Sequence, residues 1–303
     1  MDAARLTPLV PRVGMGFRLP IAQWTIDNLS RFDVLEITVD HYIYGGDRAR
    51  GIFRELSQEI AFVAHGVGLS LGTDVPLDEA YLEQVARTVD DLKMPVYSEH
   101  LAWTKAPGID LANLLPLPKT EPVAESIVAK VKRVQEVIPV PFALENISYV
   151  FEFPDSVLTD AQFFNLIFRE TGATMLLDVE NLYVNSVNHK FDPLEFMAAL
   201  PPGIVTGVHL AGGPLVSRPY LDEPVWVDGH NAPVHDEALA LLNRVLDDHN
   251  PDTIILERDD GLEDEDDVEE ISRDIDRIRA YVDARFYGKV LPDAESHASR
   301  PSA

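Results

Sequence analysis

The chain has 303 residues, of which 46% are hydrophobic, and its formal net charge is −26. This length fits two average domains or one large α/β barrel, and either would bury a sizeable apolar core. Because the chain contains no cysteine, it cannot form disulfides, zinc–thiolate sites, iron–sulfur clusters or a cysteine nucleophile. Any bound metal must therefore be held by His, Asp, Glu or Asn side chains.

The acidic charge limits the partners that the protein would attract. A surface of this sign repels nucleic acid and anionic membranes, and it favours cations or basic peptide segments. Acidity also has a simpler explanation, since surface charge keeps proteins soluble. The first residues, MDAARLTPLVPRVG, lack the apolar region of a signal peptide, and no run of about 18 apolar residues follows. We therefore expect a soluble cytoplasmic protein that binds neither nucleic acid nor membrane.

Short apolar strands alternate with helical segments along most of the chain. In chain order, strands are expected at residues 13–18, 34–39, 61–66, 96–100, 142–146, 174–178, 205–211 and 253–258. A helix is expected after each strand, at residues 23–30, 47–59, 78–92, 121–138, 160–171, 192–200, 235–249 and 267–287. Few of the strands alternate between polar and apolar residues, which is typical of strands buried on both faces of a parallel sheet.

Eight βα units of this size predict one α/β domain, a (β/α)8 TIM-type barrel that spans residues 12–288. Local signals support the boundaries of the helices. Pro122 lies in the first turn of its helix, and Gly172 directly follows the last residue of another. We expect residues 289–303 to form a disordered tail.

The segment 176–189, LLDVENLYVNSVNH, changes character abruptly. It begins as a buried strand that ends in Asp178, and Glu180, Asn181 and His189 then follow, with further asparagines between them. An apolar strand that presents a carboxylate at its last residue is typical of a site at the carboxyl end of a barrel strand. We expect the polar residues after Asp178 to shape a loop over that site, before the next helix at 192–200.

The other strands end in the same way. The strand ends and the loops after them carry Arg18, Glu36, Asp40, His41, His65, Glu99, His100, Glu145, Asn146, Asp178, Glu180, Asn181, His209, Asp228, His230, His235, Glu257 and Asp259. Each of these residues alone has a structural explanation, such as a salt bridge to Arg18 or Arg258 or a hydrogen bond in the core. Their convergence at one end of a closed barrel would be costly without a cation, through desolvation and like-charge repulsion. We therefore predict a metal site there.

The residue types indicate which metals would bind. Imidazole and carboxylate ligands without thiolate suit iron, manganese or zinc. The candidate ligands comprise four histidines (His65, His100, His209 and His230) and four carboxylates (Glu145, Asp178, Asp228 and Glu257). Eight ligands exceed what one ion can take, so two or three ions are expected. The roles of His41, His189 and His235 stay open. His235 could orient a ligand or only begin its helix, His189 could bind a metal or close a loop by a hydrogen bond, and His41 is similarly open.

Seven motifs together are similar to those of one known family. They are HGVGLSLG (65–72), SEHLAW (98–103), LLPLPKT (114–120), LENISY (144–149), LLDVENLYVNSVNH (176–189), VHLAGG (208–213) and DGHNAPV (228–234). They resemble the multinuclear non-haem iron-dependent oxidative enzymes, a formerly uncharacterised family that includes the methanobactin-biosynthesis oxidase. The resemblance runs from about residue 14 to residue 257, which is nearly the whole chain.

The resemblance implies a fold, a reaction and partners. The family has a TIM-type barrel that holds two or three irons. Mixed-valent iron activates dioxygen, and the oxidant removes hydrogen from a residue of a ribosomally made precursor peptide. A partner protein that recognises the peptide leader usually delivers this substrate. For this chain the resemblance therefore implies iron, O2 as co-substrate, a precursor peptide and a leader-recognising partner protein.

The resemblance also assigns roles to individual residues. By motif, the implied metal ligands are His65, His100, Glu145, Asp178, Asn181, His209, Asp228, His230 and Glu257, with Glu145, Asp178 and His209 as the catalytic centre. Arg18, Glu99 and Asn146 would orient these ligands from behind. Apart from Asn181 and the three orienting residues, this is the ligand set chosen above from the strand ends.

The chain departs from the family pattern at four places. Relatives commonly have an HPEN-like segment where residues 38–41 read TVDH, Asn in place of Glu180, His in place of Gly213, and EWD where residues 257–259 read ERD. We expect all four to lie near the mouth of the pocket, where they would affect the choice of substrate residue. The modified residue is therefore left open among Cys, Asp and Asn types.

Two other classes of function share these features. Sugar isomerases and some hydrolases on the same barrel also gather His and carboxylates around zinc or manganese ions. The acidic surface argues against a nucleic-acid substrate among them. A non-catalytic protein with structural metals is the third alternative, and eight ligands at an open barrel mouth argue against it.

Overall fold

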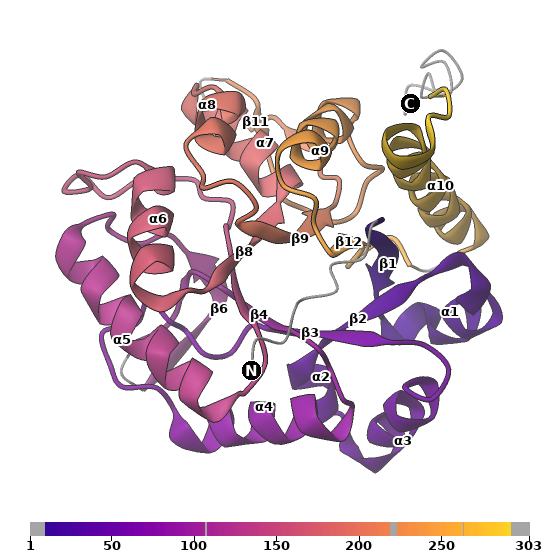
Figure 1. The fold of residues 1–303 in the computed structure, drawn as a ribbon, viewed down its shortest axis with the longest axis horizontal. Helices are drawn as coiled ribbons and strands as arrows, with labels where there is room; N and C mark the ends of the chain where they lie inside the picture. The colour runs from indigo at the N-terminus through magenta and orange to yellow at the C-terminus, as the bar shows by residue number, and fades with distance from the viewer. Residues whose placement is uncertain (1–9, 107, 219–222, 263, 292–303) are drawn as a thin grey trace.

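The computed structural model describes residues 10–106, 108–218, 223–262 and 264–291, and it contains the predicted barrel. Eight parallel strands close in the order β1-β12-β9-β8-β7-β4-β3-β2, with helices as an outer ring (Figure 1). Most of the tail expected at residues 289–303 lies outside the described residues. The barrel strands are β1 (Arg12–Gly16), β2 (Val34–Thr38), β3 (Phe62–Gly66), β4 (Tyr97–His100), β7 (Phe142–Glu145), β8 (Thr174–Asp178), β9 (Val205–Leu210) and β12 (Thr253–Leu256).

Helices connect successive strands, as a parallel sheet requires. They are α1 (Ala22–Asp27), α2 (Val39–Tyr44), α3 (Gly46–Leu56), α4 (Glu79–Asp91), α5 (Glu121–Val137), α6 (Asp160–Thr171), α7 (Val179–His189), α8 (Pro193–Ala198), α9 (Asp236–Asp248) and α10 (Glu265–Tyr287), with short 3-10 turns at Leu19–Ile21 and Leu29–Arg31. Two small antiparallel hairpins that we did not predict complete the fold. They are β5 (Trp103–Ala106) with β6 (Ile109–Leu115), and β10 (Leu215–Val216) with β11 (Val225–Trp226). Both follow strands that end in candidate ligands.

The expectation of a loop after Asp178 is wrong, because residues 179–189 form helix α7. The Asp178 side chain caps this helix, with Oδ1 accepting a hydrogen bond of 2.7 Å from the Asn181 amide. Val179 and Leu182 are buried against the rest of the molecule. The asparagines that hid the helical period in the sequence are also largely buried, where they bond to neighbouring loops.

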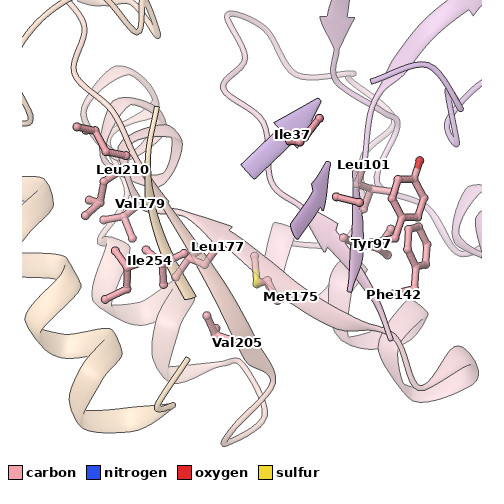
Figure 2. Close-up of a cluster of buried hydrophobic side chains, with 14 of the residues drawn as sticks. Ile37, Tyr97, Leu101, Phe142, Met175, Leu177, Val179, Val205, Leu210 and Ile254 are labelled. Carbon is pink, nitrogen blue, oxygen red and sulfur yellow. The ribbon is translucent and has the colours of Figure 1, made fainter. Parts of the chain in front are cut away.

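Residues on alternate sides of each strand form two separate cores. The large core lies between the sheet and the helices and includes Tyr97, Phe142, Met175 and Leu177 (Figure 2). A small cluster of Val34, Val63 and Ile255, with Val96 packed against it, is separate from the large core. These strand positions alternate with those of the large core, so the small cluster lies inside the barrel.

The same alternation places Arg258 on the outside of the barrel. Arg258 stands where relatives commonly have Trp, and the expectation that this difference lies near the pocket mouth is therefore wrong. Arg258 is 1% exposed and pairs with Asp274 at 3.3 Å and Glu270 at 3.2 Å, both on α10. It therefore fastens the last helix to the barrel. None of the described helices combines the length and the apolar composition needed to cross a membrane.

Replacing Arg258 should test this fastening. We expect Arg258→Met to lower the free energy of unfolding by about 3 kcal/mol, because removing one partner of a buried ion pair leaves the other carboxylate incompletely compensated. Urea denaturation would measure the loss. Arg244→Met is the matched control, since Arg244 pairs with Asp248 in solvent. Equal unfolding midpoints for the two variants would contradict the assignment.

Candidate metal centre

The carboxyl ends of the barrel strands bring most of the predicted ligands together. Ligand atoms lie within 4.8 Å of one another in three groups: Glu36, His65 and His209; His65, His100 and Glu145; and Glu145, Asp178, His209 and Glu257. The side chains come from six neighbouring strands and the loop after β12. All of them except His100 are at least nine-tenths buried. The structure thus gathers six predicted ligands, and it adds Glu36.

Glu145 lies at the centre of this arrangement and is 1% exposed. Its Oε1 lies 3.0 Å from His209 Nδ1, and its Oε2 lies 3.3 Å from the Nε2 atoms of both His65 and His100. One carboxylate therefore faces two groups of ligands with its two oxygens. This is the geometry of a carboxylate that could bridge two metal ions.

The four candidate histidines share one property: a second group holds one of the two ring nitrogens and leaves the other to face the centre. His100 Nδ1 lies 3.2 Å from the Gly66 carbonyl, which can only accept a hydrogen bond. His65 Nδ1 lies 2.9 Å from Ser98 Oγ, and this hydroxyl already donates to the Ala64 carbonyl. These partners assign the ring hydrogen to Nδ1 in both residues. Their Nε2 lone pairs are left to face Glu145.

The other two histidines follow the same rule with carboxylates as partners. His209 Nε2 lies 2.8 Å from Glu36 Oε2, while its Nδ1 faces Glu145 and Glu257. His230 Nδ1 lies 3.2 Å from Asp259 Oδ2. A partner on the second nitrogen is the usual support of a metal-binding histidine, because it fixes the tautomer and the ring orientation.

Buried polar atoms without hydrogen-bond partners converge on the same place. Within the described part of the chain they include Glu145 Oε2, Asp178 Oδ2, Asn181 Oδ1, Asp228 Oδ1 and His230 Nε2. Buried polar atoms are almost always paired, and an unpaired one destabilises the fold. Oxygen and nitrogen lone pairs that face one another satisfy this rule when a cation lies between them. The donor set therefore fits metal ions.

Asp228 and His230 form a further pair beside this centre. His230 Nε2 lies 2.6 Å from Asp228 Oδ1, yet neither atom has a hydrogen-bond partner of suitable geometry among the described residues. The second oxygen of Asp228 accepts a hydrogen bond from Ser148 at 3.1 Å. A ring nitrogen and a carboxylate oxygen this close, without hydrogen-bond geometry between them, are suited to a common ion. This pair could hold a third ion, with the unpaired Asn181 Oδ1 nearby.

The residues expected to orient the ligands take two different positions. The Asn146 side chain pairs with both the amide and the carbonyl of Asp178, at 3.0 and 2.8 Å, and so fixes the end of β8. Arg18 bonds Asp259 at 2.6 Å and lies 3.5 Å from Glu257. Glu99 is instead on the outer face of β4, where it bonds Tyr97, the Leu69 amide and the His100 amide.

A cavity of about 430 Å³ lies above the ligands, and Arg18, Thr38, His41 and Asp259 line it together with them. Of the departing segment 38–41, Thr38 and His41 therefore line the cavity, whereas Val39 is buried and Asp40 accepts a hydrogen bond from Tyr81. Glu180 and Gly213 are not part of this lining. Glu180 is fully buried and bonds His235, whose other nitrogen lies 3.0 Å from the Gly213 carbonyl. These two departures lie behind the cavity, so the expectation for them is wrong.

The three histidines with open roles take separate positions. His41 lies on α2 at the rim of the cavity. His189 ends α7 and its Nε2 lies 2.8 Å from the Tyr149 carbonyl, which is the expected loop-closing bond. His235 is the residue before the first turn of α9, and its ring lies edge-to-face against Trp226. None of the three joins the groups of ligand atoms described above.

Glu36 belongs to the centre, although the sequence reasoning did not name it as a ligand or as an orienting residue. It stands inside β2 rather than at its end. The strand period contains the signal, because Val34, Glu36 and Thr38 share one face of β2 and Val34 faces the barrel interior.

The charges of the centre shift its pKa values in opposite directions. Burial alone would lower the pKa of His209, but the carboxylates of Glu257, Glu36 and Glu145 raise it well above its ordinary value. Burial likewise opposes the charged form of Glu145, and the neighbouring histidines outweigh it and lower that pKa to about 2. In the absence of metal, His209 thus binds a proton that compensates the carboxylates.

The fold and the site define a (β/α)8 barrel protein whose buried His, Glu and Asp groups could bind several metal ions. The chain belongs to the family of RiPP precursor modification enzymes described as MbnB/TglH/ChrH, whose model matches residues 12–283. RiPP denotes a ribosomally synthesised and post-translationally modified peptide. The family assignment agrees with the resemblance inferred from the seven motifs.

Individual relatives and solved structures agree with this assignment. A UPF0276 protein of Shewanella amazonensis is 33% identical over 270 residues, which cover 88% of this chain and 93% of that protein. A xylose isomerase domain protein from Planctomyces limnophilus has a TM-score of 0.61 at 11% identity, covering 93% of this chain and 100% of that one. Endonuclease IV from Thermus thermophilus has a TM-score of 0.57 at 19% identity, with coverage of 90% and 99%. The two structures show the fold alone.

Glu36 offers a test of the histidine geometry. We expect Glu36→Leu to weaken the binding of a divalent metal by about 10- to 100-fold, because His209 loses the acceptor that orients its ring. Glu36→Gln should retain most of the affinity, since the amide oxygen can still accept from Nε2. Competition with a chelator would measure both variants. Wild-type affinity in a folded Glu36→Leu protein would contradict this role.

The raised pKa values of His209 and His230 predict how metal binding depends on pH. A metal must displace a proton from each ring nitrogen that it binds, so apparent affinity should fall as the pH is lowered. Because these pKa values lie above that of a free imidazole, affinity should still rise between pH of about 7 and about 8. Metal titration at several pH values, with proton release measured, would check this. A plateau above pH of about 7 would contradict it.

Proposed function

We propose that this protein is a cytoplasmic, iron-dependent oxidase that uses O2 to modify a residue of Cys, Asp or Asn type in a ribosomally synthesised precursor peptide. The observation that carries the proposal is the centre around Glu145, where two groups of ligands share one carboxylate. Two or three ions held this closely could act together on one co-substrate. Membership of the RiPP modification family supports a peptide as the substrate.

The ligand chemistry supports iron. The centre offers imidazole and carboxylate groups and no thiolate, a set that suits iron in non-haem oxygen chemistry. We assign His65, His100, Glu145, Asp178, His209, Asp228, His230 and Glu257 as ligands, with Asn181 as a further one. When bound, mixed-valent iron would supply the electrons for O2 reduction and a Lewis acid for the substrate side chain.

The residues of the chain would position both reactants. Glu145 lines the cavity, where a substrate side chain from the mouth would meet the centre. Ligand atoms of Asp178 and His209 lie within 4.8 Å of a Glu145 oxygen. In each of the four histidines, the ring nitrogen that faces away from the centre has a hydrogen-bond partner: Ser98, the Gly66 carbonyl, Glu36 or Asp259. The ligands are therefore oriented before a metal binds. Such preorganisation avoids reorganisation of the ligands during the reaction.

The cavity and the surface charge support a peptide delivered from outside. A volume of about 430 Å³ accommodates one side chain and its backbone, with the buried Arg18 and the exposed His41 in its lining. The net charge of −26 would attract a basic segment of a leader peptide. We further propose that a leader-recognising partner protein presents the peptide at this mouth. Neither nucleic acid nor membrane is part of the proposal.

Anaerobic purification followed by metal analysis and O2 uptake tests the proposal. We expect two or three irons per chain and O2 consumption that depends on a candidate precursor peptide, with a matching mass change in that peptide. His209→Ala should lose both iron and uptake. His189→Gln is the matched control, because His189 bonds the Tyr149 carbonyl instead of the centre.

Two results would contradict the proposed oxidase or its ligands. Stoichiometric zinc or manganese without iron, together with hydrolysis or sugar isomerisation and no O2 uptake, would favour the alternative class of barrel enzyme. Retention of iron and activity by His209→Ala would overturn the ligand assignment while leaving the family assignment intact.

A further inference from the structure

Three small side chains contribute to the floor of the barrel beneath the centre. Gly207, Ala143 and Ser98 each stand two residues before a candidate ligand on their strands, so they face the same interior. The interior of such barrels is ordinarily filled by layers of bulky branched residues. A side chain on Gly207 would place its first carbon 2.9 Å from Leu176 Cδ1, so this glycine packs closely against Leu176. Space is left beside the small residues, and the bulkier Val63, Val96 and Leu176 also border it.

A cavity of about 170 Å³ occupies that space. Its lining includes Pro95 and Pro141, which are exposed just before the first residues of β4 and β7. It also includes Glu36 and Ser98, which are 2% and 6% exposed. The cavity therefore runs from the base of the barrel to the underside of the centre, on the face opposite to the mouth.

The inner end of the cavity meets the groups that hold two of the candidate ligands. Glu36 Oε2 lies 2.8 Å from His209 Nε2, and Ser98 Oγ lies 2.9 Å from His65 Nδ1. The other oxygen of Glu36, Oε1, is buried and has no hydrogen-bond partner among the residues that the structure describes. An unpaired buried carboxylate oxygen is costly, so this atom requires a hydrogen-bond donor.

The chemistry of the inner end selects water over a cation. His209 Nε2 and His65 Nδ1 direct their hydrogens at Glu36 and Ser98, so neither nitrogen has a lone pair free for a metal at this level. A single carboxylate oxygen then remains, which is too few ligands for a metal site. The outer end is polar, with Arg12 and Asp252 in the lining. The rest of the lining includes the apolar residues Val63, Val96 and Leu176. Water would therefore be held by the polar groups at the two ends, whereas a wholly apolar cavity would stay dry.

We propose that this cavity is a water passage from the base of the barrel to the underside of the metal centre. An ordered water donates a hydrogen bond to Glu36 Oε1 and holds the carboxylate where its other oxygen accepts from His209 Nε2. The water exchanges with solvent at the base while a peptide closes the mouth. This last role rests on the proposed function, whereas the water site itself does not.

A crystal structure of the metal-loaded full chain, with a variant that fills the cavity, tests the proposal. We expect an ordered water within hydrogen-bond distance of Glu36 Oε1 and further waters towards Pro95. Gly207→Val should remove these waters and weaken zinc(II) binding by about 10-fold, because Glu36 loses its support. Ala143→Val provides a second, smaller obstruction if the first variant does not fold. Gly51→Val is the control, since a side chain there meets no atom within 4 Å.

Several outcomes would overturn the proposal. A dry cavity that takes up xenon under pressure would show an apolar void, and a protein group bonded to Glu36 Oε1 would remove the need for water. Wild-type zinc(II) affinity in a filled variant that has lost the water would refute its supporting role. Zinc(II) titration requires neither iron nor turnover, so these results are distinguishable from a failure of the proposed oxidase activity.

Discussion

The hydrogen bonds on the outer nitrogens of the four histidines are the interaction on which the rest of the site depends. Ser98, the Gly66 carbonyl, Glu36 and Asp259 each hold one ring nitrogen. The opposite nitrogen of every ring then faces carboxylate oxygens across a buried space. Without cations, the lone pairs of these oxygens and nitrogens would face one another, or bound protons would have to balance the carboxylate charges. Metal ions between them would accept all of these lone pairs at once.

In the barrel, the strand residues that stabilise the fold and those that form the centre lie on opposite faces of the sheet. Outward-facing strand residues pack against the helices in the large core, and the buried ion pair of Arg258 with Asp274 fastens the last helix. Inward-facing positions carry ligands at the carboxyl ends of the strands, and beneath them small residues such as Gly207 and Ala143 alternate with branched ones such as Val63. This mixed packing leaves a cavity below the centre with polar groups at its two ends.

Much of this organisation was predictable from local patterns. The βα rhythm predicts the closed barrel, and polar residues at strand ends, such as Asp178 and His209, predict where the centre lies. Glu36 was missed because it stands inside its strand, and helix α7 because buried asparagines interrupt its apolar face. Arg258 was misplaced because adjacent strand residues face opposite sides. The short hairpins β5–β6 and β10–β11 carry too little periodicity to be recognised.

Anomalous diffraction at the iron absorption edge, from crystals of anaerobically prepared protein, tests the central claim most directly. The account predicts one iron among His65, His100 and Glu145, and a second among Glu145, Asp178, His209 and Glu257, with Glu145 between them. A third peak beside Asp228 and His230 would extend the centre. The absence of any anomalous peak within the barrel, in crystals that contain stoichiometric iron elsewhere, would contradict it.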